Sequence, residues 1–96
     1  MIYLYYSEKF QAYNFGPEHP FNPARLMLAY KLMEEEGLID DLTCKVEPKP
    51  AGVADLQRVH TREYIASVQA EVQDLAFGLG SDDTPVFPGI YEASRL

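Results

Sequence analysis

The chain has 96 residues, 47% of them hydrophobic and 24% charged, which is the composition of at most one small globular domain. Fifteen acidic residues outnumber eight basic ones, and the net charge of -7 disfavours a nucleic-acid partner and favours a cationic one, or serves only solubility. No apolar run reaches the roughly 20 residues that a membrane span needs, and the N-terminus lacks the features of a secretion signal, so a cytoplasmic location is expected.

The N-terminal part of the chain predicts a strand followed by a long loop. Residues 1–6, MIYLYY, form a short continuous apolar run, which is typical of a strand buried on both faces. Residues 7–23 have no steady period and are interrupted by one glycine and three prolines, so we expect a loop. Four aromatic residues argue against disorder in this loop, and long ordered loops usually carry function.

The next segment predicts a helix that begins at Asn22–Pro23 and ends before Gly37. Asparagine caps free backbone N–H groups, proline fits the first helical position, and glycine is a common residue just beyond a helix end. Its apolar stripe is broad, so we expect this helix to be well buried at its start, with Glu34 to Glu36 forming a solvated end. The stripe consists of Leu26, Ala29, Tyr30 and Met33, and is widened by Leu28 and Leu32.

The second half of the chain predicts one more strand and further helices. Residues 42–50, LTCKVEPKP, alternate and form the strand, in which Cys44 is expected to be a buried structural thiol. A short helix is expected within residues 51–60, and Thr61 is expected to cap a helix over residues 62–77. The remaining segment predicts a loop that becomes helical from Gly89.

Strands that alternate with helices predict an α/β fold with parallel strands. Two strands do not make a stable sheet covered on both faces, so we expect an incomplete domain. The chain has two histidines and one cysteine, far apart in sequence, which leaves no zinc-site spacing, and its carboxylates fit no calcium loop.

Three stretches carry a resemblance to a known family: GPEHPFNPARL at 16–26, VHTREYI at 59–65 and GLGSDDTPVFPGIYEAS at 78–94. In this order and spacing they resemble the N-terminal part of the histone deacetylase superfamily. The bacterial acetoin-utilisation branch is the nearest in pattern, and acetylpolyamine amidohydrolases are also similar. The resemblance covers nearly all of residues 1–96. It implies part of an arginase/deacetylase-like domain, in which flanking helices cover a parallel, mostly eight-stranded sheet.

The resemblance implies an activity for a longer parent protein. Members of the family hydrolyse the amide of acetylated lysine or of small acylated amines, with a divalent metal, usually zinc, paired histidines and a tyrosine. In the family these groups lie later in the chain than the stretches found here. Residues 1–96 are therefore expected to be an N-terminal segment that has no catalytic residue and no metal ligand, and is inactive alone.

The resemblance also assigns roles to particular residues. Arg25 matches an arginine of the internal channel that takes acetate, where a guanidinium pairs with a carboxylate; the alternative is an exposed arginine at a helix start. Asp83 matches an aspartate at the rim that accepts hydrogen bonds from backbone N–H groups of the substrate. Asp82 is the second candidate for this position. The alternative for both aspartates is an Asx turn that only stabilises the loop.

The histidines are given no catalytic role. His19 and Pro20 match a His-Pro step in the loop that walls the substrate tunnel. Tyr13, Phe15 and Phe21 are expected to line or buttress that wall, or to be ordinary core aromatics. His60 is expected to pack or cap between two helices.

The sequence is also compatible with two other functions. The chain is alternatively a short non-catalytic module that associates with itself or with a partner through an exposed sheet edge. A third hypothesis is a lysine-peptide binder that uses Asp82, Asp83 and the aromatic loop.

Overall fold

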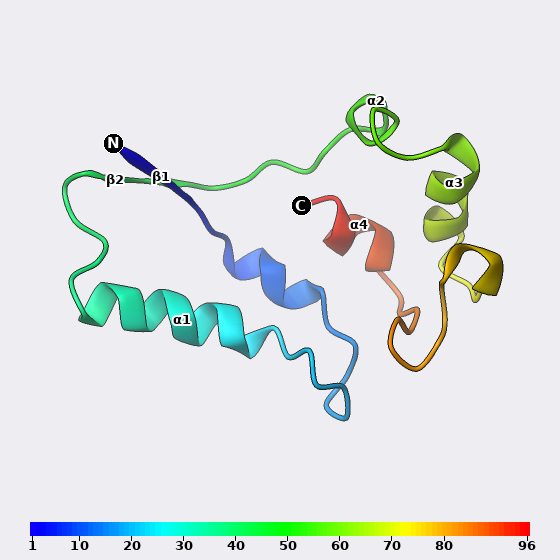
Figure 1. Cartoon of the computed structure of the whole chain (residues 1–96), viewed down its shortest axis with the longest axis horizontal. Helices are drawn as coiled ribbons and strands as arrows, with labels where there is room; N and C mark the ends of the chain where they lie inside the picture. The colour runs from blue at the N-terminus through cyan, green and yellow to red at the C-terminus, as the bar shows by residue number, and fades with distance from the viewer.

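Two parallel strands, four α-helices and two short 3₁₀ helices organise the chain, which the computed structural model describes over residues 1–96. Figure 1 shows the strands and the longest helix on one side and the three shorter α-helices on the other. In chain order the elements are β1 Ile2–Tyr5, η1 Glu8–Ala12, α1 Ala24–Glu35, β2 Thr43–Val46, α2 Val53–Leu56, α3 Arg62–Ala70, η2 Leu75–Phe77 and α4 Ile90–Ser94.

The sheet confirms the predicted parallel pairing. Ile2 lies opposite Thr43 and Tyr5 opposite Val46, in one continuous parallel register. The prediction that the first strand is buried on both faces is wrong for this chain, because the side chains of Ile2 and Tyr5 are 63% and 62% exposed. A sheet of two strands has two unpaired edges, and no further layer of this chain covers β1. Cys44 lies in β2 as predicted, but it is half-buried.

The predicted loop over residues 7–23 contains the 3₁₀ helix η1, which was not predicted. The Ser7 hydroxyl accepts the N–H of Lys9 at 3.1 Å and starts this helix. The same hydroxyl donates to Glu47 Oε1 at 2.6 Å, so the buried serine connects the segment after β1 to the segment after β2.

Local signals set both ends of α1 as predicted. The side chain of Asn22 accepts the N–H of Ala24 at 3.0 Å at the start of the helix. At its other end Gly37 has a φ of +69°, and the N–H of Leu38 donates to the carbonyl of Met33 at 2.9 Å. This bond across a left-handed glycine is the usual way in which a helix C-terminus is closed.

The expected burial of α1 is wrong, because none of its residues is buried and Leu26, Leu28 and Leu32 are exposed. Its contacts with the strand side are polar and aromatic. Glu34, predicted to be only solvated, accepts from Lys45 of β2 at 2.8 Å, and this hydrogen bond lowers the pKa of the Glu34 carboxyl.

The helix that begins after Thr61 is shorter than predicted. Thr61 accepts the N–H of Tyr64 at 3.2 Å, which confirms the cap. Helix α3 ends at Ala70 rather than near residue 77, because Glu71 takes a left-handed conformation with a φ of +55°. The Glu71 carboxylate accepts the N–H of Gly89 at 3.0 Å, and this contact connects the end of α3 to the start of α4. The predicted helical onset near Gly89 is confirmed by α4.

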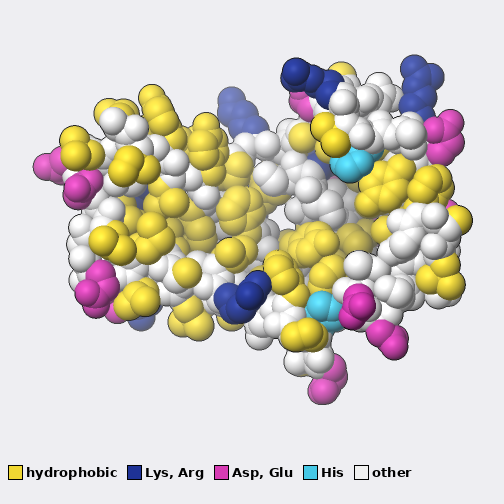
Figure 2. All heavy atoms as spheres, in the orientation of Figure 1, with side chains coloured by type: hydrophobic (Ala, Val, Ile, Leu, Met, Phe, Trp, Pro, Cys, Tyr) yellow, Lys and Arg dark blue, Asp and Glu magenta, His cyan; other side chains and the backbone are white.

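The molecule is flat, and little of it is buried. Its radius of gyration is 15.8 Å, against about 13 Å for a compact domain of this length. Its accessible surface is 7065 Å², against roughly 5,600 Å² for a typical folded monomer of this mass. The buried apolar side chains are Pro23, Ile65, Leu79 and Ile90, while hydrophobic atoms cover much of the face over β1, β2 and α1 (Figure 2).

None of the helices combines the length and the apolar character that a membrane crossing requires.

Candidate functional site

Two loops that are far apart in sequence meet at one place, and they carry most of the predicted site residues. His19 of the proline-rich loop lies with its Nε2 atom 2.9 Å from the carbonyl oxygen of Asp83. These residues are 64 positions apart in the chain. The structure therefore brings the predicted wall histidine and the predicted rim aspartate into direct contact.

An aromatic cluster lies at this meeting point; we define it as Tyr13, Phe15, Phe21 and Phe87. Phe87 comes from the second loop, and its ring centroid lies 5.9 Å from that of Tyr13 and 5.8 Å from that of Phe15. Edge-to-face arrangements at such distances are favourable for aromatic rings. The expectation that the aromatics of the first loop buttress the wall is consistent with this packing.

Partial burial of the aromatic cluster changes the pKa of Tyr13. Desolvation raises the pKa of the Tyr13 phenol, and the nearby Tyr64 hydroxyl raises it further. Tyr13 is therefore a neutral hydrogen-bonding group and not a phenolate near neutral pH.

The proline-rich loop is held by its own hydrogen bonds. The Asn14 side chain accepts the N–H of Gly16 at 2.8 Å, and the carbonyl of Gly16 accepts the N–H of His19 at 3.3 Å. Gly16 has a φ of +100°, which L-residues rarely adopt. Pro20 follows His19 directly and is exposed, and its ring fixes the backbone beside the histidine.

The loop that carries the acidic pair is stabilised by hydroxyl groups. The Thr84 hydroxyl donates to the carbonyl of Gly78 at 2.6 Å, and the N–H of Thr84 donates to Ser81 Oγ at 3.2 Å. The carboxylates of Asp82 and Asp83 are exposed and make no hydrogen bond or ion pair within the chain. The alternative of an Asx turn is therefore wrong, and both carboxylates are free to accept hydrogen bonds from a ligand.

Arg25 lies at the edge of the same region. It is exposed in the first turn of α1, and its guanidinium lies 4.8 Å from the ring centroid of Phe21. Phe21 lines an open groove of about 400 Å³, but Arg25 does not. The local position fits the simpler alternative of an exposed helix-terminal arginine, and the acetate-channel role stays a prediction.

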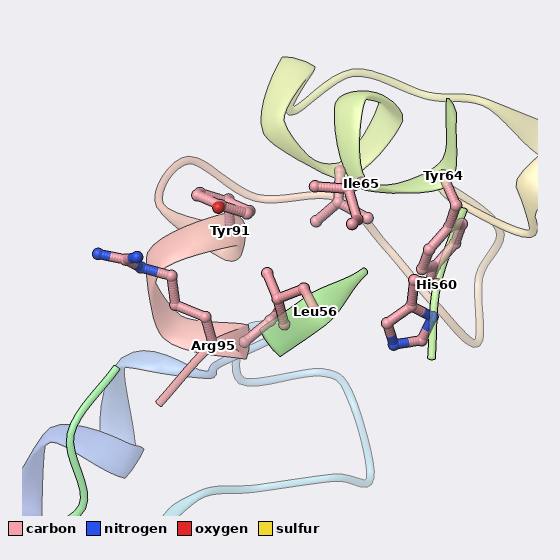
Figure 3. Close-up of a pocket in the computed structure, with 8 residues that line it drawn as sticks. Leu56, His60, Tyr64, Ile65, Tyr91 and Arg95 are labelled. Atoms are coloured by element: carbon pink, nitrogen blue, oxygen red, sulfur yellow. The ribbon is translucent and has the colours of Figure 1, made fainter. Parts of the chain in front are cut away.

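His60 lies outside this region. Its ring packs on Tyr64, with the centroids 5.1 Å apart, so it packs between α2 and α3 as expected while Thr61 provides the cap. His60 also lines a groove of about 90 Å³ with Leu56, Ile65, Tyr91 and Arg95 (Figure 3). Typical ligand pockets measure about 300–1,000 Å³, so this groove is small for a substrate.

The residues of this chain do not fit a metal site. No group of three or more His, Cys, Asp or Glu side chains lies close enough together to hold a metal ion. The zinc that the sequence resemblance implies for a parent protein therefore has no ligand set among residues 1–96.

One contributor to the site and one contact outside it were not predicted from the sequence. Phe87 has no predicted role, although an aromatic residue between two prolines in PVFP, residues 85–88, repeats the composition of the first loop. Glu71 was also missed, because its contact with Gly89 depends on a left-handed backbone that glutamate seldom adopts.

Comparison with known proteins gives consistent matches along the chain. The histone deacetylase domain matches residues 19–96. The acetoin utilization protein AcuC of Bacillus subtilis (strain 168) is 40% identical over 99 residues, covering 95% of this chain and 25% of AcuC. Histone deacetylase clr6 of Schizosaccharomyces pombe is 34% identical over 100 residues, covering 95% of the chain and 24% of clr6. Histone deacetylase 1 of Oryza sativa subsp. japonica is 33% identical, covering 94% of the chain and 19% of that protein. The chain thus spans a quarter or less of the length of these relatives.

Proposed function

The chain belongs to the histone deacetylase domain family, and from this premise we propose that it forms part of the substrate entrance of a metal-dependent deacetylase. The reaction is hydrolysis of an amide bond, either of an acyl-lysine on a protein or of a small acylated amine. In this proposal His19, Pro20 and the aromatic cluster form the wall of the tunnel. Asp83, with Asp82 as the alternative residue, accepts backbone N–H groups of the substrate at the rim, and Arg25 lies towards the acetate channel.

One observation carries the proposal: the bond of 2.9 Å between His19 and the backbone of Asp83. Two loops that are far apart in sequence, and that the family resemblance assigns to the entrance, are held against each other there. Both acidic side chains stay exposed and without a partner, as a site that accepts substrate N–H groups requires. The net charge of -7 also favours a substrate that carries unacylated basic residues beside the neutral acyl-lysine.

The metal and the proton-transfer groups are proposed to come from polypeptide outside residues 1–96. This chain alone is expected to position substrate without cleaving it. Its residues do three things in the reaction: they shape the tunnel, exclude water with the aromatic cluster, and orient the substrate backbone at the rim.

A chimera tests the rim assignment. Residues 1–96 replace the matching stretch of histone deacetylase clr6, and deacetylation of an acetyl-lysine peptide is measured for Asp83→Asn, Asp82→Asn and Asp41→Asn. Loss of a charged hydrogen-bond acceptor costs about 1.5–3 kcal/mol, so Asp83→Asn should lower kcat/KM by about 10- to 100-fold, mainly through KM.

The control position, Asp41, is an exposed aspartate before β2 that no proposed role uses. Asp41→Asn should leave kcat/KM near the parent value, and Asp82→Asn should have a smaller effect than Asp83→Asn. If both rim variants behave like Asp41→Asn, the rim assignment is wrong.

A second candidate function is association through the sheet edge, which the exposure of β1 favours. Tyr3 and Tyr5 are each 62% exposed on a strand that has one unpaired edge. Such an edge is a template for another strand from a partner or a second copy. Size-exclusion chromatography with light scattering distinguishes the two candidates, because this candidate predicts a dimer mass and a monomer argues against it.

A further inference from the structure

The two ring nitrogens of His19 bind to two different loops. Nδ1 lies 3.0 Å from the backbone nitrogen of Phe21 in its own loop, and Nε2 lies 2.9 Å from the carbonyl oxygen of Asp83 in the other. A backbone N–H only donates and a backbone carbonyl only accepts. Nδ1 must therefore accept and Nε2 must donate. Both contacts are satisfied together only by the neutral imidazole with its proton on Nε2.

The surroundings hold the imidazole ring in place. His19 is half-buried, and its ring centroid lies 4.6 Å from that of Phe15. Phe15 in turn packs on Phe87 of the second loop at 5.8 Å. The bond from His19 therefore spans two segments that also touch through an apolar contact.

His19 binds an atom of Asp83 that leaves the acidic side chain available. His19 binds the backbone carbonyl and not the carboxylate, so it fixes the position of the loop without neutralising its acidic side chain. A histidine bound to the carboxylate would occupy the group that the substrate needs.

We propose that His19 is a positioning residue: in its Nε2–H form it fastens the Asp82–Asp83 loop to the proline-rich loop and thereby sets where the acidic rim stands. The part of this inference that concerns substrate binding rests on the proposed function. The tautomer and the connection between the loops are properties of the chain itself, and they are tested without turnover.

Two substitutions separate the two bonds. The Asn side chain places an acceptor near the position of Nδ1 but does not reach Asp83. The Gln side chain places a donor near Nε2 but leaves Phe21 without its acceptor. His19→Asn should therefore keep only the bond within the loop, and His19→Gln only the bond between loops. His60→Gln is the matched control, because His60 is an exposed histidine that touches neither loop.

Nuclear magnetic resonance of the full 96-residue chain provides the readouts. Long-range ¹H–¹⁵N spectra of wild type should show His19 as the Nε2–H tautomer. Exchange of the Phe21 amide should be about three- to tenfold faster in His19→Gln than in wild type or His19→Asn, as expected for the loss of one net hydrogen bond. The ¹³C shift of the Asp83 carbonyl should move in His19→Asn and stay near wild type in His19→Gln.

The inference would be overturned by a dominant Nδ1–H tautomer or by a mixture of the two tautomers. It would also be overturned if the two His19 variants gave equal responses at the Phe21 amide and at the Asp83 carbonyl. None of these results would alter the effect of Asp83→Asn on turnover, so failure of the positioning role and failure of the proposed function are distinguishable.

Discussion

Replacing Gly80 by alanine tests how rigidly the acidic loop is held. Gly80 begins the loop that carries Asp82 and Asp83 and has a φ of +93°. A Cβ atom there would lie 2.6 Å from Cγ, 2.9 Å from Cβ and 3.1 Å from Cα of Gln73. The side-chain end of Gln73 can rotate away, but its Cβ and Cα cannot, so the loop or the segment after α3 must shift.

The expected cost has two parts. Positive φ costs an alanine about 1–2 kcal/mol, and steric overlap with a packed segment costs about 1–3 kcal/mol more. Gly80→Ala should therefore destabilise the chain by roughly 2–5 kcal/mol in thermal unfolding followed by circular dichroism.

Gly16→Ala is the matched control, because Gly16 has a φ of +100° and a Cβ atom there would have no atom within 4 Å. This variant should show only the backbone part of the cost. The Tm of Gly80→Ala should lie at least about 5 °C below that of Gly16→Ala. Equal Tm values for the two variants would show that the contact between Gly80 and Gln73 does not constrain the loop.

Three further predictions concern single side chains. Thr61→Ala should destabilise the chain by about 1 kcal/mol in urea unfolding, because the N–H of Tyr64 loses its acceptor. The stability of Thr61→Ser should stay near that of wild type. Equal urea midpoints for the two variants would contradict the cap. Lys45→Met should raise the pKa of Glu34 towards its ordinary value in a carboxyl ¹³C titration, because the lysine hydrogen bond lowers that pKa, and an unchanged titration would argue against this pair. The phenol of Tyr13 should titrate above the ordinary tyrosine pKa in aromatic ¹³C spectra, and an ordinary midpoint would contradict the desolvation inferred for the aromatic cluster.

Features that depend on local chemistry could be predicted from the sequence. Asn22 caps α1, Gly37 ends it and Thr61 caps α3, because each of these contacts joins residues a few positions apart. The parallel pairing of β1 and β2 follows from the helix between them, since a crossover helix returns the chain in the same direction.

Burial could not be predicted in the same way. The apolar pattern of MIYLYY and of α1 indicates which faces are suited to burial, but it does not say whether this chain itself covers them. The end of α3 was missed because the left-handed Glu71 is stabilised by Gly89, a residue 18 positions away. Long-range contacts of this kind leave no local signal.

The candidate site shows the same division. Proline and glycine spacing marked the two loops, and the family resemblance singled out His19 and Asp83. The bond between them, the participation of Phe87 and the free carboxylates became visible only in three dimensions.

We propose that residues 1–96 wall a substrate entrance and that the metal-dependent chemistry lies outside these residues. Zinc-dependent deacetylation of an acetyl-lysine peptide, measured side by side for the isolated chain and for its chimera with clr6, tests this most directly. Turnover is expected from the chimera and not from the chain alone. Turnover by the isolated chain, or an inactive chimera that is folded and loaded with zinc, would contradict it.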